Sequence, residues 1–160
     1  SLKPFILNVH AAGGQAMMEA ARDAATEEAQ SQGAERPLIL GVTVLTSLDE
    51  VDLKNIGFSE SPVDQVKRLA NLAQESGLDG VVCSADEVEP LRARCGQNFK
   101  LLTPGIRPKW AAIDDQKRTV TPSVALAKGS DFLVIGRPIT NARDPAAAVS
   151  LIERELGNES

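Results

Sequence analysis

The stretch Asp131-Phe-Leu-Val-Ile-Gly-Arg-Pro-Ile139 indicates the fold class of this chain. It contains four consecutive apolar residues, Phe132 to Ile135, without polar alternation, which is typical of a strand buried on both faces of a parallel sheet. Gly136 and Arg137 follow at the carboxyl end of that strand. Because α/β proteins bind ligands at the carboxyl ends of their strands, this Gly-Arg pair predicts an anion site, with phosphate as the favoured anion. The alternative interpretation is a surface arginine on a strand-to-helix loop.

Segments of the same kind precede this stretch. Apolar strands are predicted at 5–10, 37–45, 79–84 and 99–103, and main helices at 15–32, 61–77, 86–95, 121–129 and 145–156. A short helical insertion is predicted at 49–57. The polar residues 109–120 lack helical periodicity, which is typical of a functional lid or a disordered segment. The strict alternation of strands and helices predicts a parallel sheet with right-handed crossovers.

Two architectures are built from such units. A doubly wound open sheet suits five strands, whereas a (β/α)8 barrel needs eight strands and about 250 residues. A barrel usually binds phosphate in the loops after its last two strands, and here those loops carry Gly105-Ile-Arg107 and Gly136-Arg137. This favours the barrel. We therefore expect residues 1–160 to form one partial (β/α) barrel domain that covers about the last five units, with its first strand beginning at residue 5.

Composition and charge argue against several classes of protein. The net charge of −5 makes nucleic acid and anionic membranes poor partners. The sequence shows no apolar run near 18 residues and no signal peptide, so a cytoplasmic protein is expected. Cys83 and Cys95 fit a reducing cytosol, with a disulfide between them as the alternative. His10 is the only histidine, so no metal site is predicted, and we interpret His10 as structural.

Six stretches together resemble the C-terminal part of bacterial orotidine 5′-phosphate decarboxylases. They follow the order of that family and span nearly the whole chain. The six stretches are Leu7-Asn-Val-His-Ala-Ala-Gly-Gly14, Gly41-Val-Thr-Val-Leu-Thr-Ser47, Gly77-Leu-Asp-Gly-Val-Val-Cys-Ser-Ala85, Leu102-Thr-Pro-Gly-Ile-Arg-Pro108, Asp115-Gln-Lys-Arg118 and Val134-Ile-Gly-Arg-Pro-Ile139.

The resemblance implies an enzyme of pyrimidine biosynthesis. Members of that family are (β/α)8 barrels that act as homodimers, with active sites near the subunit interface. They are carbon-carbon lyases that convert orotidine 5′-phosphate to uridine 5′-phosphate (UMP) and carbon dioxide, without a metal or other cofactor. The expected partners of this chain are therefore that substrate and product and a second copy of the chain.

The resemblance also implies a set of binding residues. Arg137 and the backbone of Gly136 would bind the phosphate, and Gln116 would bridge phosphate and pyrimidine from the loop at 109–120. Arg107 matches a nucleotide-binding arginine, and Thr46 matches a hydroxyl residue that contacts the pyrimidine. These roles fit the chemistry, because a guanidinium binds phosphate bidentately and an amide both donates and accepts. The alternatives are solvated loop residues for Arg107 and Gln116, and a helix cap for Thr46.

The residues that carry the family's chemistry have no match here. In the family, a lysine from the second barrel strand acts with an Asp-x-Lys-x-x-Asp motif from the third. The nearest match, Asp52-Leu-Lys-Asn-Ile-Gly57, lacks the final aspartate and lies in the polar insertion, so we interpret it as an exposed short helix. We assign no catalytic residue and expect this chain alone to bind its ligand without decarboxylating it.

Two other functions are open at this point. One is a non-catalytic phosphate-binding α/β module. The other is a different phosphosugar barrel enzyme, such as a relative of hexulose-phosphate synthase, which would prefer a sugar phosphate to a pyrimidine nucleotide. Thr46 and Gln116 argue against the second, because they match positions that contact the base.

Overall fold

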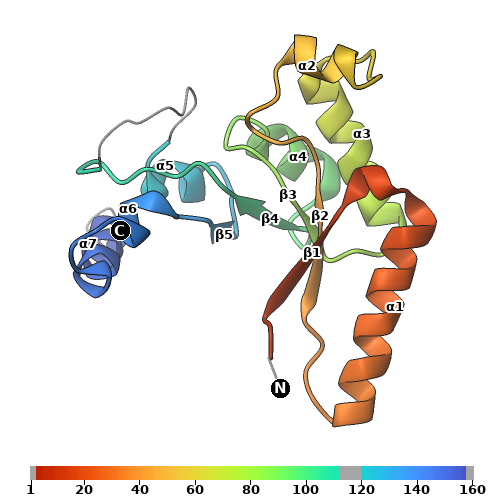
Figure 1. Ribbon diagram of the computed structural model, residues 1–160, viewed down its shortest axis with the longest axis horizontal. Coiled ribbons are helices and arrows are strands. Elements are labelled where there is room, and N and C mark those ends of the chain that lie inside the picture. The colour runs from red at the N-terminus through yellow and green to blue at the C-terminus, as the bar shows by residue number, and fades with distance from the viewer. Residues whose placement is uncertain (1–2, 112–119, 158–160) are drawn as a thin grey trace.

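The computed structural model describes residues 3–111 and 120–157, which form a parallel sheet and its connecting helices (Figure 1). The strands are β1 (Ile6–His10), β2 (Leu38–Val42), β3 (Gly80–Val82), β4 (Lys100–Thr103) and β5 (Phe132–Leu133). The main helices are α1 (Gln15–Gln32), α3 (Pro62–Glu75), α4 (Val88–Cys95), α5 (Pro122–Ala127) and α7 (Pro145–Gly157). Shorter helical segments are η1 (Ala11–Gly13), α2 (Glu50–Asn55) and α6 (Arg137–Thr140).

The strand order decides between the two architectures. The sheet runs β1-β2-β3-β4-β5, with every neighbouring pair parallel. A doubly wound sheet reverses its strand order at a switch point, whereas a barrel adds strands in chain order. The described strands are therefore a segment of a (β/α) barrel, as the sequence predicts. A ring contact agrees with barrel curvature, because Phe5 before β1 and Phe132 of β5 have centroids only 5.7 Å apart.

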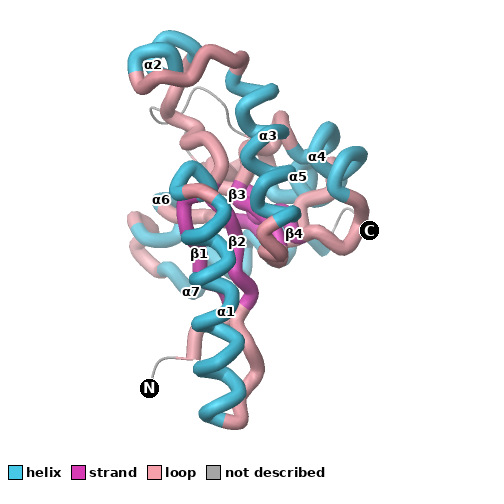
Figure 2. Tube along the Cα trace, turned by 90° about the vertical axis from the view of Figure 1, so that its right-hand side faces the viewer, coloured by secondary structure: helices cyan, strands magenta, loops and turns pink. Residues whose placement is uncertain are grey.

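The hydrophobic core lies between one face of the sheet and the helices. Ile39 of β2, Val81 of β3 and Leu101 of β4 point to that face and are buried there. Helices α1 and α3 cover it from the outside (Figures 1 and 2), and α3 contributes Val66 and Leu69. Among the described helices, none is both long and apolar enough to cross a membrane.

The two outer strands are more exposed than their apolar sequences predict. In β1 no residue is buried, and Leu7 is 45% exposed. In β5 both residues are half-buried, and the adjoining Val134 is 44% exposed. The prediction of fully buried strands at 5–10 and 132–135 is thus wrong. The physical reason is that each of these strands pairs on one side only among the described residues, so its other edge and part of its faces meet no neighbour.

Local capping explains where several helices begin. The Ser61 hydroxyl accepts from the Asp64 N–H at 3.2 Å, and Pro62 occupies the first turn, as the sequence predicts. Asp49 caps α2 in a reciprocal capping box with Asp52. Asp144 accepts from the Ala147 N–H at 3.1 Å at the start of α7.

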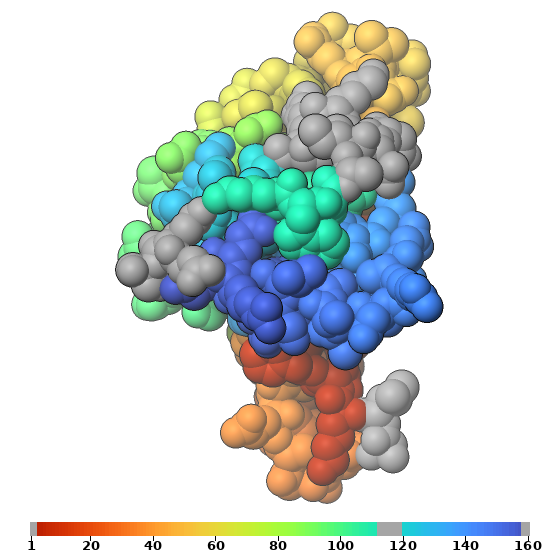
Figure 3. Space-filling model, turned by 90° about the vertical axis from the view of Figure 1, so that its left-hand side faces the viewer, coloured from red at the N-terminus to blue at the C-terminus, as the bar shows by residue number. Residues whose placement is uncertain are grey.

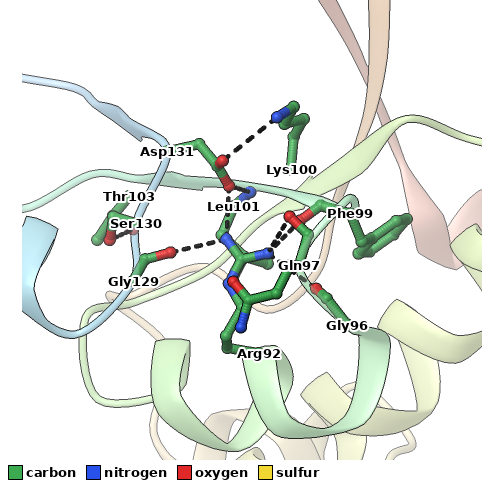
Figure 4. A network of polar contacts seen from close by, with 10 residues as sticks. All are labelled: Arg92, Gly96, Gln97, Phe99, Lys100, Leu101, Thr103, Gly129, Ser130 and Asp131. Carbon is green, nitrogen blue, oxygen red and sulfur yellow. Dashed lines mark hydrogen bonds and ion pairs between the residues drawn. The ribbon is translucent and has the colours of Figure 1, made fainter.

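A charged network fixes the amino-terminal ends of β4 and β5 (Figure 4). Asp131, just before β5, accepts from the Leu101 N–H at 2.8 Å and pairs with Arg92 of α4 at 2.6 Å. The same guanidinium donates to the carbonyl oxygens of Phe99 and Gly129 at 2.7 Å each. These groups lie at the end of the strands opposite to the expected ligand site, so their role is stability.

A similar aspartate–arginine pair lies before β3. Asp79 accepts from the Ile39 N–H at 2.7 Å and pairs with Arg36 at 2.6 Å. In both places an aspartate just before a strand binds a backbone N–H of the preceding strand and an arginine. The carboxylate thereby sets the register of two parallel strands.

We expect Asp131→Asn to lower the free energy of unfolding by about 1–2 kcal/mol at pH 7, because it removes the counter-charge of a mostly buried guanidinium. Burial raises the pKa of Asp131, but the Leu101 N–H and Arg92 outweigh it and the pKa is lowered overall. The stabilisation by the carboxylate is therefore present above its unfolded pKa of about 4 and is lost as pH falls through the lowered folded value.

Urea unfolding of both proteins at several pH values measures this difference. The two stabilities should converge in acid below about pH 4. A difference that stayed constant from pH 7 down to pH 3 would show that the charge of Asp131 is not what stabilises this end of the sheet.

Candidate functional site

The predicted binding arginines lie in the loops that leave the carboxyl ends of β4 and β5. Arg107 follows β4, and Arg137 begins α6 directly after the β5 segment. Figure 3 views the face on which α6 and α7, in blue, adjoin the residues that lead into the loop after β4, in blue-green. Because neighbouring parallel strands end at the same edge of the sheet, the fold brings these two loops together.

Arg107 is held at the base of the loop after β4. Its backbone N–H donates to the Val120 carbonyl at 2.9 Å, and the adjoining Ile106 forms a parallel bridge with Val120. This bridge joins the two ends of the predicted lid. Only 6% of the Arg107 side chain surface is exposed, and its Nη2 atom is buried without a hydrogen-bond partner in the described part of the chain. A buried guanidinium nitrogen that lacks an acceptor is costly and indicates a site for an anion.

Arg137 starts a short helical turn that Gly136 caps. The Gly136 carbonyl accepts from the N–H groups of Ile139 at 2.8 Å and Thr140 at 3.0 Å. A Cβ atom placed on Gly136 would meet no atom within 4 Å beyond its chain neighbours. The backbone here is therefore open to an incoming group, as expected for a glycine that approaches a ligand.

The two arginines line one pocket. Its volume is about 270 Å³. The residues that line it are Arg107, Trp110, Ala111, Arg137, Pro138, Asn141 and Ala142. This set contains two cations and no carboxylate, so the pocket is suited to an anion. Phosphate is the anion that paired guanidiniums bind best, through charge-assisted and bidentate hydrogen bonds.

The structure brings together only part of the predicted site. Arg107 and Arg137 meet in the pocket, and Gly136 adjoins it along the chain. Thr46 lies in an exposed turn beyond β2 and does not line this pocket. Its alternative role as the cap of the insertion is wrong, because Asp49 caps α2. Gln116 and most of the predicted lid lie outside the described residues.

Among the pocket residues that were not predicted as ligand contacts, two have side chains suited to contact a ligand. Trp110 follows Arg107 in the loop, and Asn141 ends the α6 turn that Arg137 begins. The sequence does not show a helix at 137–140, because the segment is short and contains Pro138. With that helix known, the spacing from Arg137 to Asn141 would place the two side chains on one helical face.

Several other residues that the sequence singles out lie outside the pocket. Asp52 belongs to the capping box of α2, and Lys54 pairs with Glu50 at 2.8 Å, so the partial motif in the insertion is an exposed helix as predicted. Both cysteines are free thiols. Burial, together with the nearby Glu87 charge, raises the pKa of the Cys83 thiol to about 12, which makes it a poor nucleophile. His10 is exposed at the end of β1 and does not line the pocket.

The sequential parallel sheet defines a (β/α)-barrel class of protein, and a pocket lined by two arginines lies at its carboxyl edge. Within that class, the chain belongs to the family described as "Orotidine 5'-phosphate decarboxylase / HUMPS family", whose sequence profile matches residues 3–152.

Individual relatives agree with the family assignment. The chain is 56% identical over 155 residues to orotidine 5′-phosphate decarboxylase of Rhodospirillum rubrum, and 57% identical over 152 residues to that of Paramagnetospirillum magneticum. It superposes on the crystal structure of orotidine 5′-phosphate decarboxylase from Lactobacillus acidophilus with a TM-score of 0.80 at 39% identity. An uncharacterized conserved protein from Geobacillus kaustophilus gives a TM-score of 0.78 at 42% identity.

These similarities cover most of this chain but less of the relatives. They include 97% of this chain and 63% of the Rhodospirillum protein, 95% and 65% for the Paramagnetospirillum protein, 94% and 62% for the Lactobacillus structure, and 95% and 63% for the Geobacillus structure. The chain thus spans just under two thirds of the length of the relatives that it matches.

Proposed function

We propose that this chain carries the phosphate- and pyrimidine-binding part of an orotidine 5′-phosphate decarboxylase, a lyase of UMP biosynthesis. The observation that carries the proposal is a pocket lined by both Arg107 and Arg137, together with an Arg107 Nη2 atom that is buried without a hydrogen-bond partner among the described residues. The names of the relatives support the same ligand class. From the family resemblance alone, we also propose that the protein is a cytoplasmic homodimer that needs no cofactor.

The roles of the residues follow from their positions. Arg107 and Arg137 neutralise the phosphate, and the open backbone at Gly136 approaches it closely. By the family resemblance, Thr46 in the exposed turn after β2 contacts the pyrimidine, and Gln116 bridges the phosphate and the pyrimidine. In this arrangement the phosphate supplies most of the binding energy, because the charged hydrogen bonds are formed there.

Calorimetric titration of the 160-residue chain with UMP, uridine and ribulose 5-phosphate tests this proposal. We expect UMP to bind about 100-fold more tightly than uridine, since uridine lacks the group that the two arginines bind. UMP should also bind more tightly than ribulose 5-phosphate if the base is contacted. Equal affinities for UMP and uridine would contradict a phosphate pocket, and tighter binding of the sugar phosphate would favour a relative of hexulose-phosphate synthase.

An assay with orotidine 5′-phosphate addresses the chemistry. The 160-residue sequence contains no Asp-x-Lys-x-x-Asp motif. Binding of the phosphate does not supply a proton donor for the carbanion that remains when carbon dioxide leaves. We therefore expect no turnover by this chain alone above a control without enzyme. Clear turnover in a preparation free of host enzyme would show that the chain holds a catalytic array of another kind.

A further inference from the structure

The anion pocket has a neutral half that the two arginines do not account for. Besides the two arginines it is lined by Trp110, Asn141 and small or apolar residues. A phosphate monoester has three terminal oxygens, each with room for more than one hydrogen bond, so a further neutral donor would find an acceptor there. A contribution of Asn141 and Trp110 to phosphate binding requires that both residues are held in place at the pocket.

The backbone N–H of Asn141 is hydrogen-bonded, whereas its side-chain amide has no hydrogen-bond partner among the described residues. Its N–H closes the α6 turn by donating to the Arg137 carbonyl at 3.0 Å. Its side-chain amide makes no hydrogen bond within residues 3–111 and 120–157, and it lines the pocket beside Arg137. The short helix thus presents a guanidinium and a carboxamide to the same cavity. The amide nitrogen donates hydrogen bonds without adding charge.

Trp110 is positioned by a turn that is fixed at both sides. The Ala111 N–H donates to the Pro108 carbonyl at 3.0 Å, and Pro108 itself is fully buried. The Lys109 N–H donates to a Glu155 carboxylate oxygen of α7 at 3.3 Å. Trp110 is 44% exposed, and it is one of the residues that line the pocket. A wall of this size excludes water, and lower local polarity strengthens the contact between arginine and phosphate.

We infer that Asn141 and Trp110 complete the phosphate subsite, Asn141 as a neutral donor to a phosphate oxygen and Trp110 as the wall that shields the contacts of the arginines. This inference rests on the proposed function and adds two specificity-determining residues to it.

Calorimetric titration with UMP tests the role of Asn141. We expect Asn141→Ala to raise the Kd about tenfold, and Asn141→Asp to raise it more, because the new carboxylate repels the phosphate. Binding of uridine should not change. Thr140→Ala is the matched control, since Thr140 is an exposed residue of the same helix that does not line the pocket. Thermal unfolding of each variant checks that the fold is kept.

The fluorescence of the only tryptophan tests the role of Trp110. Addition of UMP should change the emission of the unsubstituted chain, whereas uridine at equal concentration should not. Trp110→Ala should raise the Kd for UMP about tenfold, and Trp110→Phe less, because phenylalanine keeps most of the wall.

The outcomes separate this inference from the proposed function. If the unsubstituted chain prefers UMP to uridine but both Asn141 variants bind UMP within twofold of Thr140→Ala, the role of Asn141 is refuted and the proposed function stands. Unchanged affinity in Trp110→Ala refutes the wall in the same way. If the unsubstituted chain does not distinguish UMP from uridine, the proposed function and this inference are both wrong.

Discussion

Arg137→Ala is expected to weaken the binding of UMP by about 3 kcal/mol, roughly a hundredfold in Kd. The substitution removes a charged donor from a pocket in which the buried guanidinium of Arg107 also lies, and it leaves the phosphate only partly neutralised. Binding of uridine should change little, because uridine has no phosphate. Titration of both ligands into both proteins measures the effect.

A second arginine provides the control for this prediction. Arg143 lies between α6 and α7, a short distance after Arg137 in the sequence. It is exposed and does not line the pocket. Arg143→Ala should therefore leave the Kd for UMP within about twofold, which distinguishes a local contact from the general loss of a positive charge. Equal losses of UMP affinity in the two variants would show that Arg137 does not contact the phosphate. An equal loss of uridine affinity in Arg137→Ala would show the same.

Gly80→Ala is expected to lower the free energy of unfolding by at least about 3 kcal/mol, or to prevent folding. A Cβ atom on Gly80 would lie 2.1 Å from the carbonyl oxygen of Lys100, which is a backbone atom of the neighbouring strand. Gly80 pairs with Leu40 on one side and with Lys100 on the other, so relief of this overlap requires β3 and β4 to separate. That separation disturbs the centre of the sheet and the core beneath it.

Urea unfolding followed by circular dichroism measures this effect, with Gly41→Ala as a graded comparison. A Cβ atom on Gly41 would approach the Ala73 methyl group at 3.2 Å, a contact that a small shift of α3 can relieve. Gly41→Ala should therefore cost only about 1 kcal/mol. Equal stability of Gly80→Ala and Gly41→Ala would show that β3 and β4 do not approach each other this closely at Gly80.

The order of elements was predictable from local signals. Three of the main helices, α3, α5 and α7, begin beside a side chain that caps them, Ser61, Thr121 and Asp144 respectively, and these contacts act within a few residues of the chain. The convergence of Arg107 and Arg137 was also predictable, because parallel strands in chain order end at one edge. Both inferences need only the alternation of strands and helices.

Burial of the outer strands was not predictable in the same way. Val134 and Leu7 are apolar, but their exposure depends on whether another strand or helix lies beside them, and no local pattern reports that. The pocket residue Asn141 was missed for a related reason. Its place beside Arg137 depends on a single helical turn that lacks the length needed to show a periodic pattern.

The most direct test of the central claim is the position of the phosphate in a crystal structure of this chain with bound UMP. The phosphate should lie in the pocket between Arg107 and Arg137, with its oxygens within hydrogen-bond distance of both guanidiniums and of the backbone at Gly136. Electron density for the phosphate elsewhere on the protein, with this pocket filled only by water, would contradict the account.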